Sequence, residues 1–162
     1  MTAAPQNQTK TATTLDADEI EKFGAIAAEW WDESGKFAPL HRINPIRCAY
    51  IREKAVAHFG LHDDAIKALD GLSLIDIGCG GGLVAEPMAR IGAHVTAIDG
   101  AERNIKTAIA HAQQTGVTVD YRTTTAEDLA ATGAQYDIVL ALEIIEHVAD
   151  VELFLKSITA LV

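Results

Sequence analysis

The stretch LSLIDIGCGGGL (Leu72–Leu83) decides the fold class of this chain. Its first six residues form a short, mostly apolar run, which is typical of a buried strand. The next five, Gly78–Gly82, include four glycines. Glycine adopts positive φ values and lets a ligand approach main-chain N–H groups at the start of a helix. The stretch therefore predicts a strand, a glycine-rich loop and a helix, and either a ligand cradle or a plain tight turn explains the glycines.

The residues after this stretch continue the alternation of strand and helix. Three further apolar runs are predicted as strands: His94–Ile98, Val117–Tyr121 and Tyr136–Leu142. Each is followed by a helical pattern, in turn Ala101–Thr115, Glu127–Ala131 and Val148–Leu161. Strands that alternate with helices indicate βαβ units, so we predict an α/β fold with a doubly wound parallel sheet over residues 71–162.

The residues before the glycine-rich stretch are predicted to be a tail and a helical segment. Residues 1–15 are polar and low in complexity, which predicts a disordered tail. Residues 16–70 are expected to be helical. One helix begins at the Asp16 and Glu19 capping pattern and runs to Trp31, and a second begins at Asn44–Pro45 and ends at Phe59. A short helical piece is expected over residues 63–69, before the turn at Asp70–Gly71.

Composition excludes several classes of protein. The 162 residues are 49% apolar, and no apolar run reaches the length of a membrane span. The 13 Lys and Arg against 23 Asp and Glu leave a net charge of −10, which argues against general nucleic-acid binding. The two cysteines, Cys48 and Cys79, are too few for a disulfide framework or a cysteine zinc site. The sequence is typical of a globular cytoplasmic protein.

The glycine loop departs from the dinucleotide-binding pattern G-x-G-x-x-G. Gly78 and Gly80 fit that pattern, but Leu83 stands at the third glycine position. Asp76 sits inside the end of the strand, where the pattern expects apolar residues. Asp99 ends the next strand, where a doubly wound fold places a carboxylate for ribose hydroxyls. An acidic residue before the loop favours a ligand with a positive centre and an amino-acid tail, such as S-adenosylmethionine, over a nicotinamide dinucleotide.

This pattern resembles the class I S-adenosylmethionine-dependent methyltransferases and, among them, the ubiquinone-biosynthesis O-methyltransferase family. The resemblance is carried by WWDESGKFAPLHRINPIR (Trp30–Arg47), LIDIGCGGGLVAEPMARIGAHVTAIDG (Leu74–Gly100) and YDIVLALEIIEHVAD (Tyr136–Asp150). It implies a Rossmann-like sheet preceded by helices and methylation of a catechol or hydroquinol hydroxyl on polyprenylated ubiquinone precursors. The family has six or seven strands, so the last strands are expected to be missing from these 162 residues.

The resemblance also assigns cofactor-binding roles. Gly78 and Gly80 would cradle the methionine part of S-adenosylmethionine, with Asp76 close behind them. Asp99 would hold the ribose hydroxyls. Arg47 matches an arginine that pairs with the carboxylate of the cofactor, a contact that favours bidentate geometry.

Three further positions complete the expected cofactor site. Ala126 and Glu127, after the third strand, match the pair that meets the adenine edge. Leu142, at the end of the fourth strand, would line the pocket of the methyl donor.

Glu143, Glu146 and His147 form the candidate catalytic group. On a helical turn these three side chains would share one face. Two carboxylates and an imidazole suit a divalent cation such as Mg²⁺, which would lower the pKa of a catechol hydroxyl. The alternative is that His147 acts as a general base and removes the phenolic proton. Both roles remain open at this point.

The resemblance implies a hydrophobic, polyprenylated substrate, which suggests peripheral contact with the inner face of the membrane. It also suggests association with other quinone-biosynthesis enzymes. No nucleic-acid partner is expected. Two other functions compete with methyl transfer: a non-catalytic or inactive module that only binds S-adenosylmethionine, and a nicotinamide-dependent oxidoreductase. Leu83 and Asp76 disfavour the second.

Overall fold

The computed structural model describes residues 13–63 and 65–162. Four parallel strands form one sheet in the order β3-β2-β1-β4. Their bounds are β1 Ser73–Ile77, β2 His94–Asp99, β3 Asp120–Thr123 and β4 Ile138–Ala141. The chain winds outward from β1 through β2 to β3 and then returns to place β4 on the other side of β1. The predicted doubly wound parallel sheet is confirmed, and its strand order reverses between β1 and β4.

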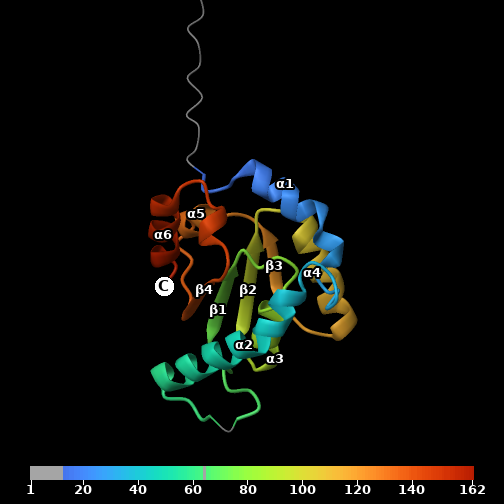
Figure 1. The fold of residues 1–162 in the computed structure, drawn as a ribbon. Helices are drawn as coiled ribbons and strands as arrows, with labels where there is room; N and C mark the ends of the chain where they lie inside the picture. The colour runs from blue at the N-terminus through green and yellow to red at the C-terminus, as the bar shows by residue number, and fades with distance from the viewer. Residues whose placement is uncertain (1–12, 64) are drawn as a thin grey trace, which may run out of the picture.

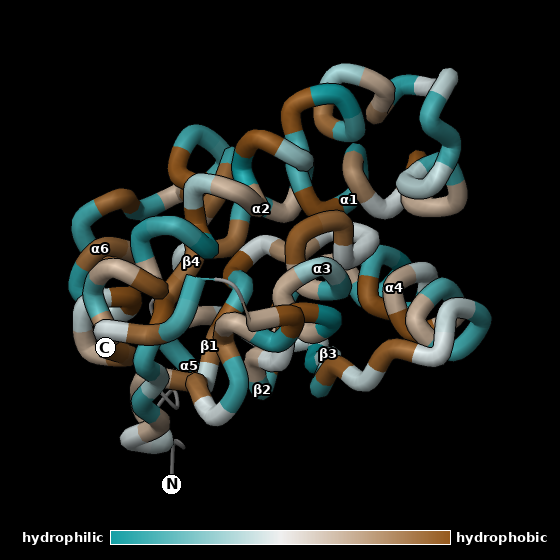
Figure 2. The backbone as a smooth tube through the Cα atoms, turned by 90° about the horizontal axis from the view of Figure 1, so that it is seen from below, coloured by the Kyte–Doolittle hydropathy of each residue, from teal (hydrophilic) through white to brown (hydrophobic). Residues whose placement is uncertain are grey.

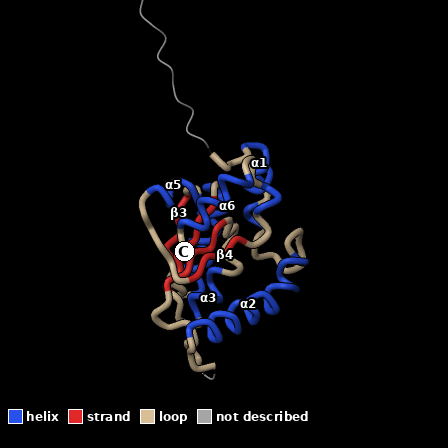
Figure 3. Tube along the Cα trace, turned by 90° about the vertical axis from the view of Figure 1, so that its left-hand side faces the viewer, coloured by secondary structure: helices blue, strands red, loops and turns tan. Residues whose placement is uncertain are grey.

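Helices cover both faces of the sheet, and the strands lie in the interior (Figures 1 and 3). The helical elements are α1 Ala17–Ala25, the 3₁₀ turn Ala27–Glu29, α2 Ala38–Phe59, α3 Ala85–Arg90, α4 Glu102–Thr115, α5 Ala126–Ala131, the 3₁₀ turn Ile145–His147 and α6 Val151–Ala160. Figure 1 shows α1 and α5 at one end of the molecule and the C-terminal end of α2 at the opposite end. Among the helices of the described residues, none combines the length and apolar character needed to cross a bilayer.

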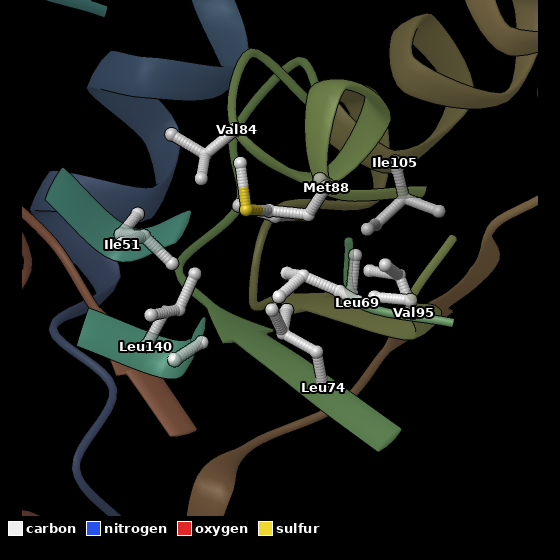
Figure 4. Packing of buried hydrophobic residues seen from close by; sticks show 13 residues of the cluster. Ile51, Leu69, Leu74, Val84, Met88, Val95, Ile105 and Leu140 are labelled. Atoms are coloured by element: carbon white, nitrogen blue, oxygen red, sulfur yellow. The ribbon is translucent and has the colours of Figure 1, made fainter. Parts of the chain in front are cut away.

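Two apolar clusters hold the helices on the sheet. On one face, side chains of α2, α3 and α4 pack on the strands; Figure 4 labels Ile51, Leu69, Leu74, Val84, Met88, Val95, Ile105 and Leu140. On the other face, α5 and α6 pack on the strands through Ile75, Ile77, Ile98, Ala126, Leu129, Phe154 and Leu161. Apolar segments accordingly gather around the strands in Figure 2, whereas outer turns of α4 are hydrophilic. Because β1 is covered on both faces, its residues from Leu74 to Ile77 are all buried, including the polar Asp76.

Helix α2 begins earlier than the sequence indicates. Asn44 and Pro45 were expected to start this helix, but it starts at Ala38 and Pro45 lies inside it. Residues before Pro45 are held in helical geometry by tertiary contacts: the Phe37 ring stacks on Trp30 at a centroid distance of 3.8 Å. The missing N–H of Pro45 falls on an exposed side of the helix, where the cost is smallest. Residues 38–43, which the sequence places between the two predicted helices, are therefore helical.

Other boundaries also shift. Asp16 caps α1 as predicted, accepting hydrogen bonds from two backbone N–H groups, but α1 ends at Ala25. Residues 63–69 form turns where a short helix was expected, with residue 64 outside the described part. The third strand starts at Asp120 instead of Val117, because the Val117 N–H closes the end of α4 by bonding to the Ala112 carbonyl at 3.0 Å.

The predicted N-terminal tail falls mostly on residues 1–12, which lie outside the described residues. Of its last three residues, Thr14 is only 3% exposed. The Thr14 carbonyl accepts a hydrogen bond from the Ala149 N–H at 3.0 Å. Ordered packing thus begins before Asp16, which corrects the predicted tail boundary.

Candidate active site

Three glycines of the glycine-rich loop after β1 have positive φ: Gly78, Gly80 and Gly82. Gly78 has φ +74° and Gly80 has φ +53°, values that side chains with a Cβ rarely adopt. The N–H groups of Gly78 and Cys79 both donate to the Ile98 carbonyl, at 2.8 and 3.0 Å, which ties the loop to β2. A Cβ at Gly80 would lie 2.4 Å from the Trp30 ring. The loop therefore needs glycine both for its backbone and for close packing.

Asp99, at the carboxyl end of β2, organises the same loop. Its Oδ2 accepts from the Gly80 N–H at 2.9 Å, and its Oδ1 accepts from the Ala101 N–H at 2.8 Å and Asn104 Nδ2 at 3.2 Å. Burial raises the pKa of Asp99, and these three hydrogen bonds oppose that rise. A carboxylate has about four lone-pair positions, so about one stays free for a ligand hydroxyl. This arrangement fits the predicted ribose contact.

Two adjoining cavities, both open to solvent, lie at this end of the sheet. The first cavity is lined by the predicted residues Gly78, Gly80, Asp99, Ala126, Glu143 and His147, and by residues of α1. The second cavity is lined by the predicted residues Arg47, Asp76, Gly78, Leu142, Glu143, Glu146 and His147. The structure thus brings every predicted site residue except Glu127 to these cavities, beside the switch point where doubly wound sheets bind ligands.

Asp76 and Arg47 lie on the wall of the second cavity. Asp76 is 3% exposed, and its pKa is raised to about 7, first by burial and second by the negative charge of Asp99. A carboxyl that titrates near neutrality gains from a cationic ligand beside it. Arg47 supplies a positive charge to the same cavity. The second cavity can therefore hold both ends of an amino acid, an ammonium near Asp76 and a carboxylate near Arg47.

Glu143, Glu146 and His147 do not converge as predicted. Glu143 has φ +52° and its carboxylate pairs with the Arg47 guanidinium. His147 Nδ1 lies 2.8 Å from Glu19 Oε2 of α1, and its Nε2 lies 3.9 Å from Glu146 Oε1. Within the described residues, no three His, Cys, Asp or Glu side chains meet as metal ligands. The expected three-ligand Mg²⁺ site does not fit this geometry, because Glu143 leaves the shared face to pair with Arg47.

Glu127 is bonded to the N-terminal segment and does not line either cavity. Its carboxylate accepts from the Thr14 backbone N–H at 2.6 Å and from Thr14 Oγ1 at 2.8 Å. Burial raises the pKa of Glu127, but the hydrogen bonds from Thr14 outweigh it and the net pKa lies below the ordinary value. The predicted adenine contact of Glu127 would compete with Thr14 for the same oxygens.

Sequence reasoning missed Asn104, which links the loop to the helical segment. Asn104 is 2% exposed, accepts from Trp30 Nε1 at 2.9 Å and donates to Asp99. A signal was present, because Asn104 stands on the buried face of α4 beside Ile105 and Ala108. A polar residue on a buried face needs a partner. Its partner Trp30 is also buried.

Comparison with known proteins places these features in context. Residues 75–162 match a family model described as "Methyltransferase domain". Over 155 residues, the chain is 55% identical to the ubiquinone biosynthesis O-methyltransferase of Brucella anthropi, covering 95% of this chain and 62% of that protein. Over 145 residues, it is 53% identical to the protein of the same name from Chelativorans sp., covering 90% and 57%. The chain thus spans about three fifths of the length of these relatives.

Solved structures share the fold. The magnesium protoporphyrin IX methyltransferase of Synechocystis PCC 6803, solved with bound S-adenosylhomocysteine, is 23% identical, with a TM-score of 0.64 over 89% of this chain and 65% of that one. An S-adenosylmethionine-dependent methyltransferase from Clostridium acetobutylicum is 16% identical, with a TM-score of 0.57 over 87% of this chain and 52% of that one. At these identities the likeness concerns the fold alone.

Proposed function

The chain belongs to the family of methyltransferase domains, and we propose from this premise that it binds S-adenosylmethionine across the two cavities and donates the methyl group to a substrate hydroxyl. The observation that carries the proposal is the coupling of Asp99 to the glycine-rich loop. The carboxylate holds the Gly80 N–H at 2.9 Å while it lines the first cavity, so one residue shapes the loop and faces the ligand. A plain tight turn would not need a half-buried carboxylate beneath it.

The proposed orientation of the cofactor follows from charge. The ribose would lie at Asp99 and the adenine beside Ala126, both in the first cavity. The amino-acid end would enter the second cavity, with its carboxylate at Arg47 and its ammonium toward Asp76. Gly78 lines both cavities and would lie beneath the middle of the molecule. The glycine cradle and the opposite charges fit the group, and the cofactor supplies an electrophilic methyl on a sulfonium.

We propose a catechol or hydroquinol of a polyprenylated quinone precursor as the methyl acceptor. The similar proteins from Brucella anthropi and Chelativorans sp. are named ubiquinone biosynthesis O-methyltransferases, which supports this substrate class. The second cavity combines polar groups with the apolar side chains of Phe23, Leu40 and Leu142, which suits an aromatic ring. A polyprenyl tail would also favour peripheral contact with a membrane surface and with enzymes that handle the same precursors.

His147 is the proposed general base. Its Nδ1 lies 2.8 Å from Glu19, so the N–H of a neutral ring is placed there and Nε2 keeps its lone pair. His147 lines both cavities, which supports the proposal that this lone pair accepts the proton of a substrate hydroxyl. Removing the phenolic proton creates the stronger nucleophile, because a free phenol is mostly protonated at neutral pH. No step is assigned to a metal, since the three candidate ligands do not meet.

Calorimetric titration tests cofactor binding directly. We expect the chain to bind S-adenosylhomocysteine and not NADH. Asp99→Asn should weaken that binding at least about tenfold, because it removes the charge and a hydrogen-bond acceptor. Asp120→Asn is the matched control, since Asp120 is exposed on β3 and lines neither of the two cavities. Binding of NADH instead would favour the oxidoreductase alternative.

Transfer of a labelled methyl group to a short-chain polyprenyl catechol tests the reaction. We expect transfer to fall by about two orders of magnitude in His147→Gln, the usual size of a general-base effect, with S-adenosylhomocysteine affinity retained. A comparison with and without Mg²⁺ shows whether a metal contributes. Cofactor binding with no transfer in any condition would refute the enzymatic part of the proposal and leave a binding module.

A further inference from the structure

Glu86 is a buried acidic residue that lines neither of the two cavities. It lies in the first turn of α3 and is 1% exposed, and its backbone N–H donates to the Gly82 carbonyl of the glycine loop at 3.1 Å. Its Oε1 lies 2.7 Å from His111 Nδ1, and its Oε2 accepts from Thr115 Oγ1 at 3.1 Å. Arg90 stands 3.7 Å away, at the surface. Burying a carboxylate costs free energy, and the three partners of Glu86 offset part of that cost.

The His111 ring, which contacts Glu86 through Nδ1, also contacts a tryptophan. It stacks on Trp31 with a centroid distance of 3.4 Å and an interplanar angle of 6°. Trp31 Nε1 in turn donates to the Gly81 carbonyl at 3.0 Å. Glu86, His111, Trp31 and Gly81 therefore form one continuous series of contacts, which ends on the backbone of the glycine-rich loop.

The loop is thus held from two sides. The Gly80 N–H is fixed by Asp99, and the carbonyl of the following residue, Gly81, is fixed by Trp31. These contacts involve the Cys79–Gly80 and Gly81–Gly82 peptide groups, which the Gly82 N–H also joins by donating to the Cys79 carbonyl at 2.9 Å. Losing either contact removes one restraint from a turn whose glycines resist distortion little. A ligand that binds the loop would then have to order it again, and its affinity would fall.

We propose that Glu86 and His111 are positioning residues for the cofactor: they hold Trp31 on the Gly81 carbonyl and so keep the glycine-rich loop ready for binding. This inference rests on the proposed function, because it takes S-adenosylmethionine as the ligand of that loop. Neither side chain touches the ligand, and both act through Trp31. A core role alone would affect folding and leave the affinity of the folded protein unchanged.

The test measures the dissociation constant of S-adenosylhomocysteine by calorimetry for the full chain and its variants. Trp31→Phe keeps the stacked ring and removes the N–H, and we expect about fivefold weaker binding, the value of one hydrogen bond. His111→Gln removes the stacked ring, and Glu86→Gln removes the charge that orients His111. Each should weaken binding by a similar factor. His58→Gln is the matched control, since His58 is exposed on α2.

The double variant Trp31→Phe/His111→Gln separates positioning from a merely structural effect. If His111 acts through Trp31, adding His111→Gln to Trp31→Phe should change the dissociation constant less than twofold. Tryptophan emission is the second measurement, because imidazole stacked on indole quenches it. His111→Gln should raise emission in the native background and leave it unchanged in the Trp31→Phe background.

Three results would overturn the inference while leaving the proposed function intact. One is native affinity in His111→Gln despite a lower melting temperature, and the second is fully additive losses in the double variant. The third is unchanged emission in His111→Gln, which would mean that the stack does not exist in solution. Failure of the unaltered chain to bind S-adenosylhomocysteine would instead refute the proposed function itself.

Discussion

Replacing Asp76 with Asn is expected to remove most of one pH-dependent contribution to stability. Asp76 is 3% exposed near the end of β1, between β2 and β4. Its pKa rises from 3.8 to about 7, first through burial and second through the negative charge of Asp99, with the Ala85 backbone N–H acting in the opposite direction. Asn has nearly the same shape and does not titrate. The variant therefore isolates the ionisation of this one group.

The sign follows from proton binding in the two states. Between pH 3.8 and about 7, the folded chain keeps the Asp76 proton that the unfolded chain has already lost. Raising the pH through this window therefore lowers the free energy of unfolding, and the loss is complete above about 7. A shift of roughly three pKa units corresponds to about 4 kcal/mol. The stability of Asp76→Asn relative to the native chain should rise by about that amount between about pH 4 and about pH 8.

Urea denaturation followed by circular dichroism measures this difference. Taking native and variant at the same pH cancels the titration of every group that they share. Asp137→Asn is a control of opposite sign: Asp137 is exposed, and its hydrogen bonds from the Ser73 N–H and hydroxyl lower its pKa, so its contribution is lost as the pH falls. An Asp76→Asn difference that is equal at acid and alkaline pH would refute the reasoning.

Three further substitutions test the site geometry. Gly80→Ala should lower the free energy of unfolding by about 3 kcal/mol, measured by urea denaturation, because its Cβ would meet a tryptophan ring at 2.4 Å and its φ is +53°; a neutral result would contradict the packing. Glu143→Gln should tighten S-adenosylhomocysteine binding up to about fivefold by calorimetry, since Glu143 pairs with the Arg47 guanidinium proposed to bind the ligand's carboxylate; weaker binding would show that Glu143 helps instead. Thr14→Val should cost about 1 kcal/mol of stability near neutral pH and less in acid, where Glu127 is protonated; a cost independent of pH would exclude this hydrogen bond as its source.

Elements with strong local signals were predicted well. The run Leu72–Ile77 and the glycines after it placed β1 and its loop, and Asp16 correctly marked the cap of α1. The least accurate boundary was the start of α2, because contacts of Phe37 with Trp30 extend that helix beyond the local proline signal. Helix ends of this kind depend on side-chain contacts with residues outside the helix, which periodicity does not report.

In the candidate site, too, the positions of the residues followed from the sequence, whereas their contacts did not. Asp76, Gly78 and Asp99 stand at strand ends, and parallel strands carry such residues to one edge, so their meeting follows from chain order alone. The hydrogen-bonding or ion-pair partner of each side chain does not follow from chain order. Helical spacing placed Glu143 and His147 on one face, yet Glu143 turned to Arg47 and His147 to Glu19 of α1.

The amino-acid sequence by itself determined the parallel sheet, the glycine-rich loop and the acidic residues beneath it. These features depend on residues that are neighbours in the chain or occupy equivalent ends of successive strands. Only the tertiary structure decided that Trp30 and Trp31 contact that loop. It also decided that Asn104 is hydrogen-bonded to both Trp30 and Asp99, and that Thr14 donates hydrogen bonds to the Glu127 carboxylate. Apart from the bond between Asn104 and Asp99, which are 5 positions apart, these pairings join residues 50 to 113 positions apart. A hydrogen bond across such a separation exists only once the packed core has fixed both partners.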